Sequence, residues 1–118
     1  MPIDLTGTAP PSDQIYQHLR GQILSGRLLP GERLATVRQL ARDLGVAPGT
    51  VARAYKQLEV DQLVVTRSAA GTRVSDHATP IPANVLYAAR ALHEHATRAG
   101  LSYDQTTAAL RTLWNASE

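Results

Sequence analysis

The sequence is short of several residue types that particular classes of protein require. It has no cysteine, which excludes disulfides and thiolate metal sites and agrees with a reducing cytoplasm. It has no phenylalanine and only 4% aromatic residues, so the core must be built mainly from Leu, Val, Ile and Ala. Single-stranded nucleic-acid binding is disfavoured too, because it needs several exposed aromatic residues in a basic groove.

Long apolar runs are also missing. No stretch approaches the ~20 apolar residues of a membrane-spanning helix. Residues 1–11 lack the basic start and apolar centre of a secretion signal. We therefore expect a cytoplasmic protein without a membrane partner. The length of 118 residues fits one domain, or a small domain with an appendage.

Patterns typical of catalysis or metal binding do not stand out. We find no Ser-His-Asp set and no paired carboxylates, so we expect neither an enzyme nor a cofactor. His93 and His95 are two residues apart and so do not share a helix face, which disfavours a joint metal site. His18 and His77 are isolated in the sequence.

The positive charge is concentrated in the first part of the chain. Residues 1–75 hold nine Arg or Lys and six Asp or Glu, a net charge of +3. Residues 76–118 hold three and four, a net charge of −1, which accounts for the total of +2. A basic surface suits nucleic acid, although most such charge is simply solvated.

Three helices are predicted after a proline-bearing arm at residues 1–11. In the first, we expect Ser12 to cap the start and Gly26 to end it. Its apolar face consists of Ile15, Leu19 and Ile23. Thr36 and Gln39 have the spacing of a capping box for the second helix, which Gly45 should end.

The second and third helices are separated by a short break. Pro48 cannot sit inside a helix but suits a first helical position, so the third helix should span about residues 48–61. Its apolar face holds Val51, Tyr55 and Leu58, with Ala54 at the border. Arg53, Lys56 and Gln57 point outward. This pattern indicates a helix-turn-helix, whose second helix enters the DNA major groove in known examples. The alternative is an αα-hairpin inside an unrelated helical protein.

The remaining sequence predicts a hairpin and two more helices. Residues 63–67 and 72–75 are β-prone and flank a turn. A linker at 76–82 precedes helices over 82–99 and from Ser102, where Gln105 completes another capping-box spacing. We therefore predict a mainly α fold with a small β-hairpin. It comprises an N-terminal winged helix-turn-helix over 1–75 and a two-helix C-terminal dimerisation segment over 76–118.

Five blocks of sequence in this order resemble the N-terminal domain of GntR-type transcriptional regulators. They are PSDQI at 11–15, ILSGRLLPGERL at 23–34, VRQLARDLGV at 37–46, GTVARAYKQLE at 49–59 and GTRV at 71–74. The VARAY run and the short tail look most like the YtrA-type branch. That resemblance implies a dimerising two-helix tail instead of a large effector domain.

The resemblance also implies DNA contacts at named positions. They are Arg38, Thr50, Arg53, Lys56, Gln57 and the wing residues Gly71, Thr72 and Arg73. Arg53 is the best candidate for reading a base, because arginine can bind guanine through two hydrogen bonds. Two alternatives stay open: Arg38 could instead pair with Asp43 or Glu32, and Arg53 with Gln57 or Glu59.

The chain departs from the family pattern at several positions. Gln62 stands where a glycine usually follows aspartate, and Pro48 where a DNA-contacting arginine is common. The other departures are Ala35 in place of proline, Ala69 and Ala70 in a wing usually rich in Gly and Arg, and Arg73 in place of phenylalanine.

The apolar stripes of the last two helices are too small for an independent core. We expect them to pack against the same helices of a second chain. A two-fold dimer would present its third helices about 34 Å apart, or a multiple, and read a palindrome-like operator. The alternative is a tail folded back on a monomer.

The expected function is that of a homodimeric, repressor-like transcriptional regulator bound to double-stranded DNA. A small-molecule effector, if one exists, would bind near the linker or the dimer interface. The competing hypothesis is a protein-interaction module that uses the same helical faces without DNA.

Overall fold

The computed structural model describes residues 3–67, 71–78 and 80–117. The chain divides into two compact units, Met1–Ile81 and Pro82–Glu118. Most of the expected linker lies in the first unit, because Ala78 is buried and the Ile81 amide donates to the Leu24 carbonyl at 2.6 Å. The functional division into residues 1–75 and 76–118 stays a prediction.

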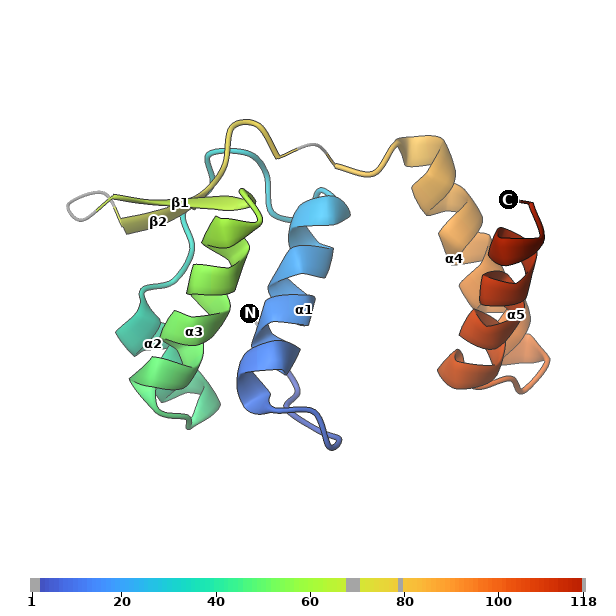
Figure 1. The fold of residues 1–118 in the computed structure, drawn as a ribbon, viewed down its shortest axis with the longest axis horizontal. Coiled ribbons are helices and arrows are strands. Elements are labelled where there is room, and N and C mark those ends of the chain that lie inside the picture. The colour runs from blue at the N-terminus through green and yellow to red at the C-terminus, as the bar shows by residue number, and fades with distance from the viewer. Residues whose placement is uncertain (1–2, 68–70, 79, 118) are drawn as a thin grey trace. The chain divides into compact units, whose positions relative to one another are not determined.

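Three helices form the body of the first unit (Figure 1). They are α1 (Pro11–Leu24), α2 (Val37–Leu44) and α3 (Pro48–Val60). The buried apolar residues include Ile15, Leu19, Ile23, Leu34, Leu40, Val51, Leu58, Val64 and Val74. The core is thus aliphatic, as the lack of phenylalanine predicted. Tyr55 joins it, with its hydroxyl donating to the Ala35 carbonyl at 2.6 Å.

The start of α2 follows the sequence prediction, and the start of α1 does not. At α2, Thr36 Oγ1 accepts a hydrogen bond from the Gln39 amide at 3.1 Å, and Gln39 Oε1 accepts one from the Thr36 amide at 2.9 Å. The capping box is confirmed. At α1 the prediction was wrong: the helix begins at Pro11, and Ser12 lies buried in its first turn. Pro11 explains this, since proline favours the first helical position and needs no amide partner there.

A tight turn separates α2 from α3. Gly45 has a φ of 68°, in the left-handed region that glycine adopts without steric cost. The amides of Gly45 and Val46 donate to the carbonyls of Arg42 and Ala41, which closes the helix end. Pro48 then starts α3. The predicted helix-turn-helix is confirmed.

A β-hairpin follows α3. Strands β1 (Val64–Arg67) and β2 (Gly71–Val74) pair antiparallel, with Val64 opposite Val74 and Arg67 opposite Gly71. The chain before α2 adds to this sheet, because the Leu34 amide donates to the Thr72 carbonyl and Arg33 forms a β-bridge with Arg73. The hairpin packs Val64 and Val74 into the core, so the winged-helix arrangement is confirmed.

The turn from α3 into β1 depends on a residue in an uncommon conformation. Gln62 has a φ of 63°, and among the residues that the structure describes no other non-glycine has a positive φ. The Gln62 amide donates to the Glu59 carbonyl and the Leu63 amide to the Leu58 carbonyl, at 3.0 and 2.9 Å. This is the turn that usually carries glycine at its left-handed position.

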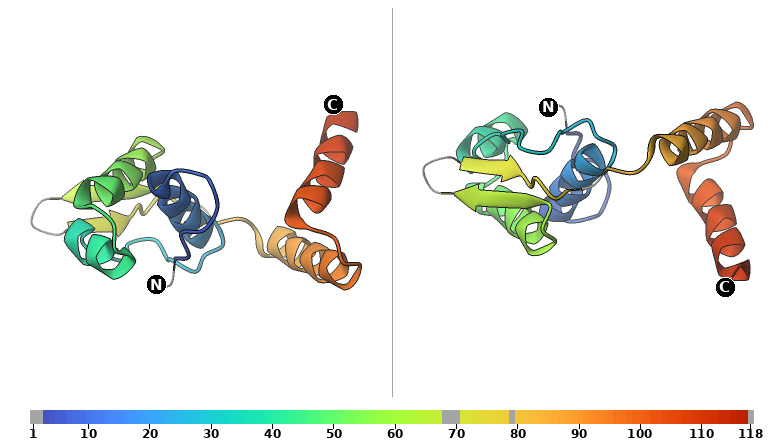
Figure 2. Two further views of the ribbon diagram at one scale, coloured as in Figure 1. Left: turned by 90° about the horizontal axis from the view of Figure 1, so that it is seen from below. Right: turned by 90° about the horizontal axis from the view of Figure 1, so that it is seen from above.

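The second unit consists of α4 (Ala83–Arg98) and α5 (Tyr103–Ala116). The two helices diverge from the turn that joins them (Figure 2). Ser102 and Gln105 form the predicted capping box of α5. Of the described residues in this unit, only Ala96 is buried, whereas large apolar side chains are exposed. These are Val85, Tyr87, Leu92, Leu101, Tyr103, Leu110, Leu113 and Trp114.

Candidate nucleic-acid interface

Helix α3 has one buried face and one polar, exposed face. Val51, Ala54, Tyr55 and Leu58 are buried against the rest of the first unit. Arg53, Lys56 and Gln57 are exposed, and Thr50 in the first turn is half-buried. The orientation predicted from helical periodicity is confirmed.

The charged group of Arg53 is unengaged. Within the described part of the chain, its guanidinium has no hydrogen bond and no ion pair, so the alternative pairing with Gln57 or Glu59 is not formed. It borders a groove of about 380 Å³ between α1 and α3. The groove is also lined by Ser12, Asp13, Tyr16, Gln17, Ala54 and Gln57. The guanidinium N–H donors of Arg53 are therefore available at the surface.

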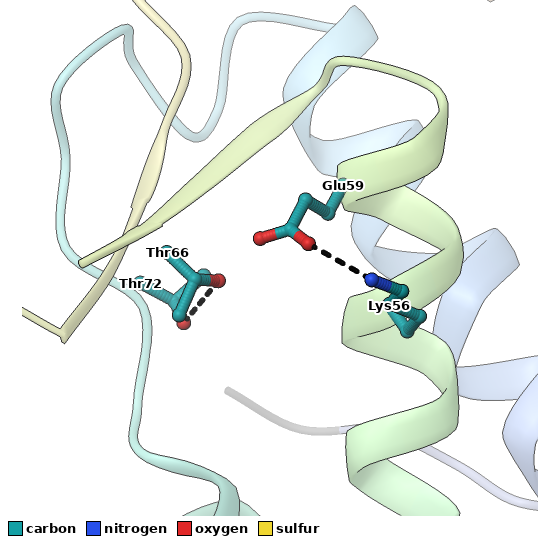
Figure 3. Close-up of polar contacts among 4 residues, drawn as sticks. All are labelled: Lys56, Glu59, Thr66 and Thr72. Atoms are coloured by element: carbon teal, nitrogen blue, oxygen red, sulfur yellow. Dashed lines mark hydrogen bonds and ion pairs between the residues drawn. The ribbon is translucent and has the colours of Figure 1, made fainter. Parts of the chain in front are cut away.

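Lys56 and Gln57 are engaged by neighbouring acids of the same helix end. Lys56 Nζ lies 3.4 Å from Glu59 Oε1, and Glu59 reaches from α3 toward the hairpin (Figure 3). Gln57 Nε2 donates to Asp61 Oδ1 at 3.3 Å. The Lys56 side chain is 73% exposed, and an exposed pair of this kind contributes little stability. A competing phosphate can therefore displace Glu59 at small cost.

Asp61 joins α3 to α1 through a side-chain network that the sequence analysis missed. The Tyr16 hydroxyl donates a short hydrogen bond to Asp61 Oδ2, which raises the pKa of Tyr16 above its usual value. Asp61 caps the carboxyl end of α3, where the helix dipole disfavours a negative charge. Hydrogen bonds from Tyr16 and Gln57 offset that repulsion. Tyr16 and Asp61 are 45 residues apart, so no local pattern predicted their contact.

Arg38 is the second residue of α2 and lies between Thr36 and Gln39, the two residues of the capping box. It is exposed, and no ion pair joins it to Asp43 or Glu32, all three being described residues. The amides at a helix start favour an anion such as a phosphate. This position agrees with the contact that the family resemblance implies.

The three predicted wing contacts lie on two faces of the hairpin. Thr72 shares its face with Thr66, and their hydroxyl oxygens are 3.2 Å apart (Figure 3). Gly71 and Arg73 share the opposite face with Arg67, according to the strand register. The structure thus separates Thr72 from the other two. Ala69 and Ala70 lie outside the described residues.

The described residues were also searched for metal-binding clusters and for membrane-spanning helices. Groups of three or more His, Cys, Asp or Glu side chains able to hold a metal ion do not occur there. The described helices include none that is both long and apolar enough to cross a bilayer.

Comparison with known proteins identifies the family. The sequence model of the bacterial regulatory proteins of the gntR family matches residues 11–74, which is more than half of the chain. The chain belongs to the gntR family. The matched segment begins at the start of α1 and ends with β2, so it spans the whole helix-turn-helix and wing.

Individual relatives agree with this assignment. The HTH-type transcriptional regulator Rv1152 of Mycobacterium tuberculosis is 45% identical over 73 residues, which cover 62% of this chain and 60% of that protein. The HTH-type transcriptional repressor YtrA of Bacillus subtilis is 37% identical over 76 residues, 64% of this chain and 58% of that protein. The matches thus span about three fifths of these relatives. The predicted resemblance to the YtrA type is confirmed.

A solved structure extends the likeness beyond the matched segment. A GntR family transcriptional regulator from Listeria monocytogenes superposes with a TM-score of 0.61 at 25% identity. The superposition covers 92% of this chain and 98% of that one. A two-helix tail after the winged helix is therefore part of the shared fold.

Proposed function

We propose that this GntR-family chain is a non-catalytic transcriptional regulator that binds a specific duplex DNA sequence through α3. The observation that carries the proposal is the exposed, unpaired guanidinium of Arg53 on a helix whose opposite face is fixed in the core. A helix that reads bases in the major groove needs one face held by the core and the opposite face polar and exposed.

The predicted site residues then divide between base reading and backbone contact. Arg53 would bind a guanine through two hydrogen bonds, a contact that discriminates against other bases by about 1–3 kcal/mol. Arg38 and Thr50 lie at the starts of α2 and α3, where helix-end amides and side chains suit phosphates. Lys56 and Gln57 extend the contact once DNA displaces their acidic neighbours.

One relative favours regulation by repression. The similar protein YtrA of Bacillus subtilis bears the name of a transcriptional repressor. A chain of this kind would act sterically, by occupying an operator that overlaps a promoter. In this proposal the wing residues Gly71, Thr72 and Arg73 assist α3 in holding the DNA.

The second unit supplies the argument for a homodimer. Its two helices leave Leu113 and Trp114 69% and 67% exposed, and Leu92, Leu101 and Leu110 border an apolar groove of about 340 Å³. Contiguous exposed apolar surface of this kind marks an interaction site. A second copy offers the same surface, and a two-fold pair would match a palindrome-like operator.

DNA binding is tested by fluorescence anisotropy with duplex DNA from the region upstream of the protein's own coding sequence. The wild type should prefer this duplex to a scrambled one, and Arg53→Ala should lose the preference together with about 1–3 kcal/mol of affinity. Arg98→Ala removes the same charge from an exposed position of α4 and serves as the control. Equal, weak binding of wild type and variant to every duplex would overturn the proposal and favour a protein-interaction module.

Dimerisation is tested by sedimentation at micromolar concentration. The wild type should sediment at twice the chain mass of 12.7 kDa, and Leu113→Glu should shift it toward the monomer, because a charge is introduced into the apolar surface. A wild-type protein that stays at the monomer mass would contradict the homodimer and, with it, the proposed palindrome-like operator.

A further inference from the structure

The β-hairpin has an outer face on which arginines from three segments of the chain meet. Strand alternation places Arg67 of β1 and Arg73 of β2 on one face of the hairpin. Thr66 and Thr72 lie on the other face, the one toward α3 (Figure 3). Arg33, in the connector before α2, forms a β-bridge with Arg73 and so shares the outer face. We call the three exposed arginines 33, 67 and 73 the arginine face.

The backbone holds the side chains of the arginine face close together. A β-carbon at Gly71 would lie 3.2 Å from Arg33 Nε and 3.3 Å from Arg33 Nη2, so the Arg33 side chain lies against the bare glycine. Gly71 is paired with Arg67 in the strand register. Arg73 Nη1 donates to the Gly31 carbonyl at 3.2 Å, which ties it to the connector that carries Arg33. The charge of Arg33 is thus brought from the row of Arg73 to the row of Arg67.

A groove of about 210 Å³ lies on this outer face. Its lining residues are Gly31, Val65, Arg67, Gly71, Arg73, Val74 and Asp76. Arg33 borders the groove, because its side chain lies against Gly71. Pockets that enclose a whole drug-sized ligand span about 300–1,000 Å³. This groove is therefore the right size for the charged group of a small ligand.

The arginine face has no anionic partner among the residues that the structure describes. Arg33 lies directly opposite Arg73, and like charges in this arrangement destabilise a sheet. Asp76 lines the same groove, yet no ion pair joins this described carboxylate to Arg33, Arg67 or Arg73. A ligand that brings several negative charges would remove the repulsion between the facing arginines.

We propose that the arginine face is the binding site of a small effector whose charged group is a diphosphate. Guanidinium groups bind phosphate oxygens through paired N–H donors. Two linked phosphates offer more oxygens and more charge than one, and so can engage the arginines of both rows. The same chemistry is found in free pyrophosphate and in a nucleoside diphosphate.

The inference goes beyond the proposed function, because the effector and the duplex would occupy different sides of the hairpin. The groove opens on the face opposite Thr72, whereas Thr72 lies on the side of α3, the helix proposed to read DNA. Arg33 and Arg67 are not among the predicted DNA contacts, so they carry the test. Arg73 is shared by both proposals and is therefore left unchanged.

Isothermal titration calorimetry of the full chain, without DNA and at fixed ionic strength, measures binding at this site. Arg33→Gln and Arg67→Gln should each lower the affinity for pyrophosphate about ten-fold or more, because each removes a charged hydrogen-bond donor. Asp76→Asn should raise that affinity, because the carboxylate that lines the groove repels the ligand. Inorganic phosphate should bind the wild type more weakly than pyrophosphate does.

Adenosine diphosphate distinguishes the two sources of the diphosphate group. Tighter binding than pyrophosphate would show that the ribose and base add contacts, and would favour a nucleotide as the effector. Equal or weaker binding would favour free pyrophosphate. In both cases Arg33→Gln should lower the affinity, because the diphosphate is the group that the arginine face holds.

Two control variants and a stability measurement make the result specific to the arginine face. Arg53→Gln removes the same charge from α3 and Arg98→Gln removes it from α4, and both should keep the wild-type affinity for pyrophosphate. Urea unfolding of Arg33→Gln should show equal or greater stability than the wild type, because the like-charge pair with Arg73 is removed. Weaker binding without weaker folding separates a ligand contact from a structural role.

The outcomes separate this inference from the proposed function. Pyrophosphate that binds the wild type and Arg33→Gln alike, or no more tightly than inorganic phosphate, would overturn the site. An equal loss of affinity in Arg53→Gln would also overturn it, since the ligand would then lie on α3. A wild type that binds no duplex but gives the expected titrations would contradict the proposed function alone, because the titrations contain no DNA.

Discussion

Gln62→Gly should stabilise the protein, because the residue occupies a conformation that favours glycine. Gln62 has a φ of 63°, and a non-glycine residue in the left-handed region costs about 1–2 kcal/mol. Glycine removes that cost but loses about 0.5–1 kcal/mol more backbone entropy on folding. The net gain should therefore be about 0.5–1 kcal/mol. The exposed Gln62 side chain makes no hydrogen bond to another described residue, so the substitution removes no contact of that kind.

Urea unfolding followed by far-UV circular dichroism measures this effect. Circular dichroism follows the helices of the first unit directly, whereas the single tryptophan, Trp114, lies in α5 of the second unit. All variants are compared at one protein concentration, because association would shift the apparent stability. Gln62→Ala is the matched control: alanine keeps the β-carbon and with it the strain, so it should give no gain. Equal stabilisation by alanine and glycine would refute the argument from backbone conformation.

Two further substitutions test the local structure that presents α2 and α3. Thr36→Ala should lower the free energy of unfolding by about 1 kcal/mol in the same urea assay, because it removes half of the capping box of α2. Tyr55→Phe should remove a pH dependence. Burial raises the pKa of Tyr55 to about 12, whereas the unfolded residue ionises near 10. The stability contributed by the neutral hydroxyl is therefore complete below about pH 10 and lost between about pH 10 and 12. The difference in stability between wild type and Tyr55→Phe should shrink over that window, and a constant difference would contradict the burial argument.

Local patterns predicted the helix-turn-helix because its decisive features are short-range. Thr36 and Gln39 are three residues apart, and Gly45 and Pro48 act on the backbone at their own positions. The buried and exposed faces of α3 followed from helical periodicity alone. The exception at Ser12 was also local, since the preference of Pro11 for the first helical position placed the helix start ahead of Ser12.

The parts that sequence reasoning missed are contacts between segments that are distant in the chain. Arg33 reaches the wing only because the connector before α2 pairs with β2, and its bridge to Arg73 spans 40 positions. Tyr16 reaches Asp61 only because α1 packs beside α3. Neither the connector nor the helix carries a motif for these pairings, so the charge count placed Arg33 only in a basic surface.

In the proposed function, the network around Asp61 bears on which residue of α3 would read the DNA. Gln57 can recognise adenine only by offering both its amide hydrogen and its carbonyl oxygen, and in the free protein its Nε2 donates to Asp61. The Gln57 amide has a second N–H, but the bond to Asp61 fixes its orientation. Turning the amide toward a base would leave Asp61 with only the hydrogen bond from Tyr16 among its described side-chain partners. Arg53 has no such bond to break. Arg53 can therefore bind a base without losing a contact in the free protein, which favours it as the main base-reading residue. Gln57 would bind a base only where the new hydrogen bonds offset the one lost to Asp61.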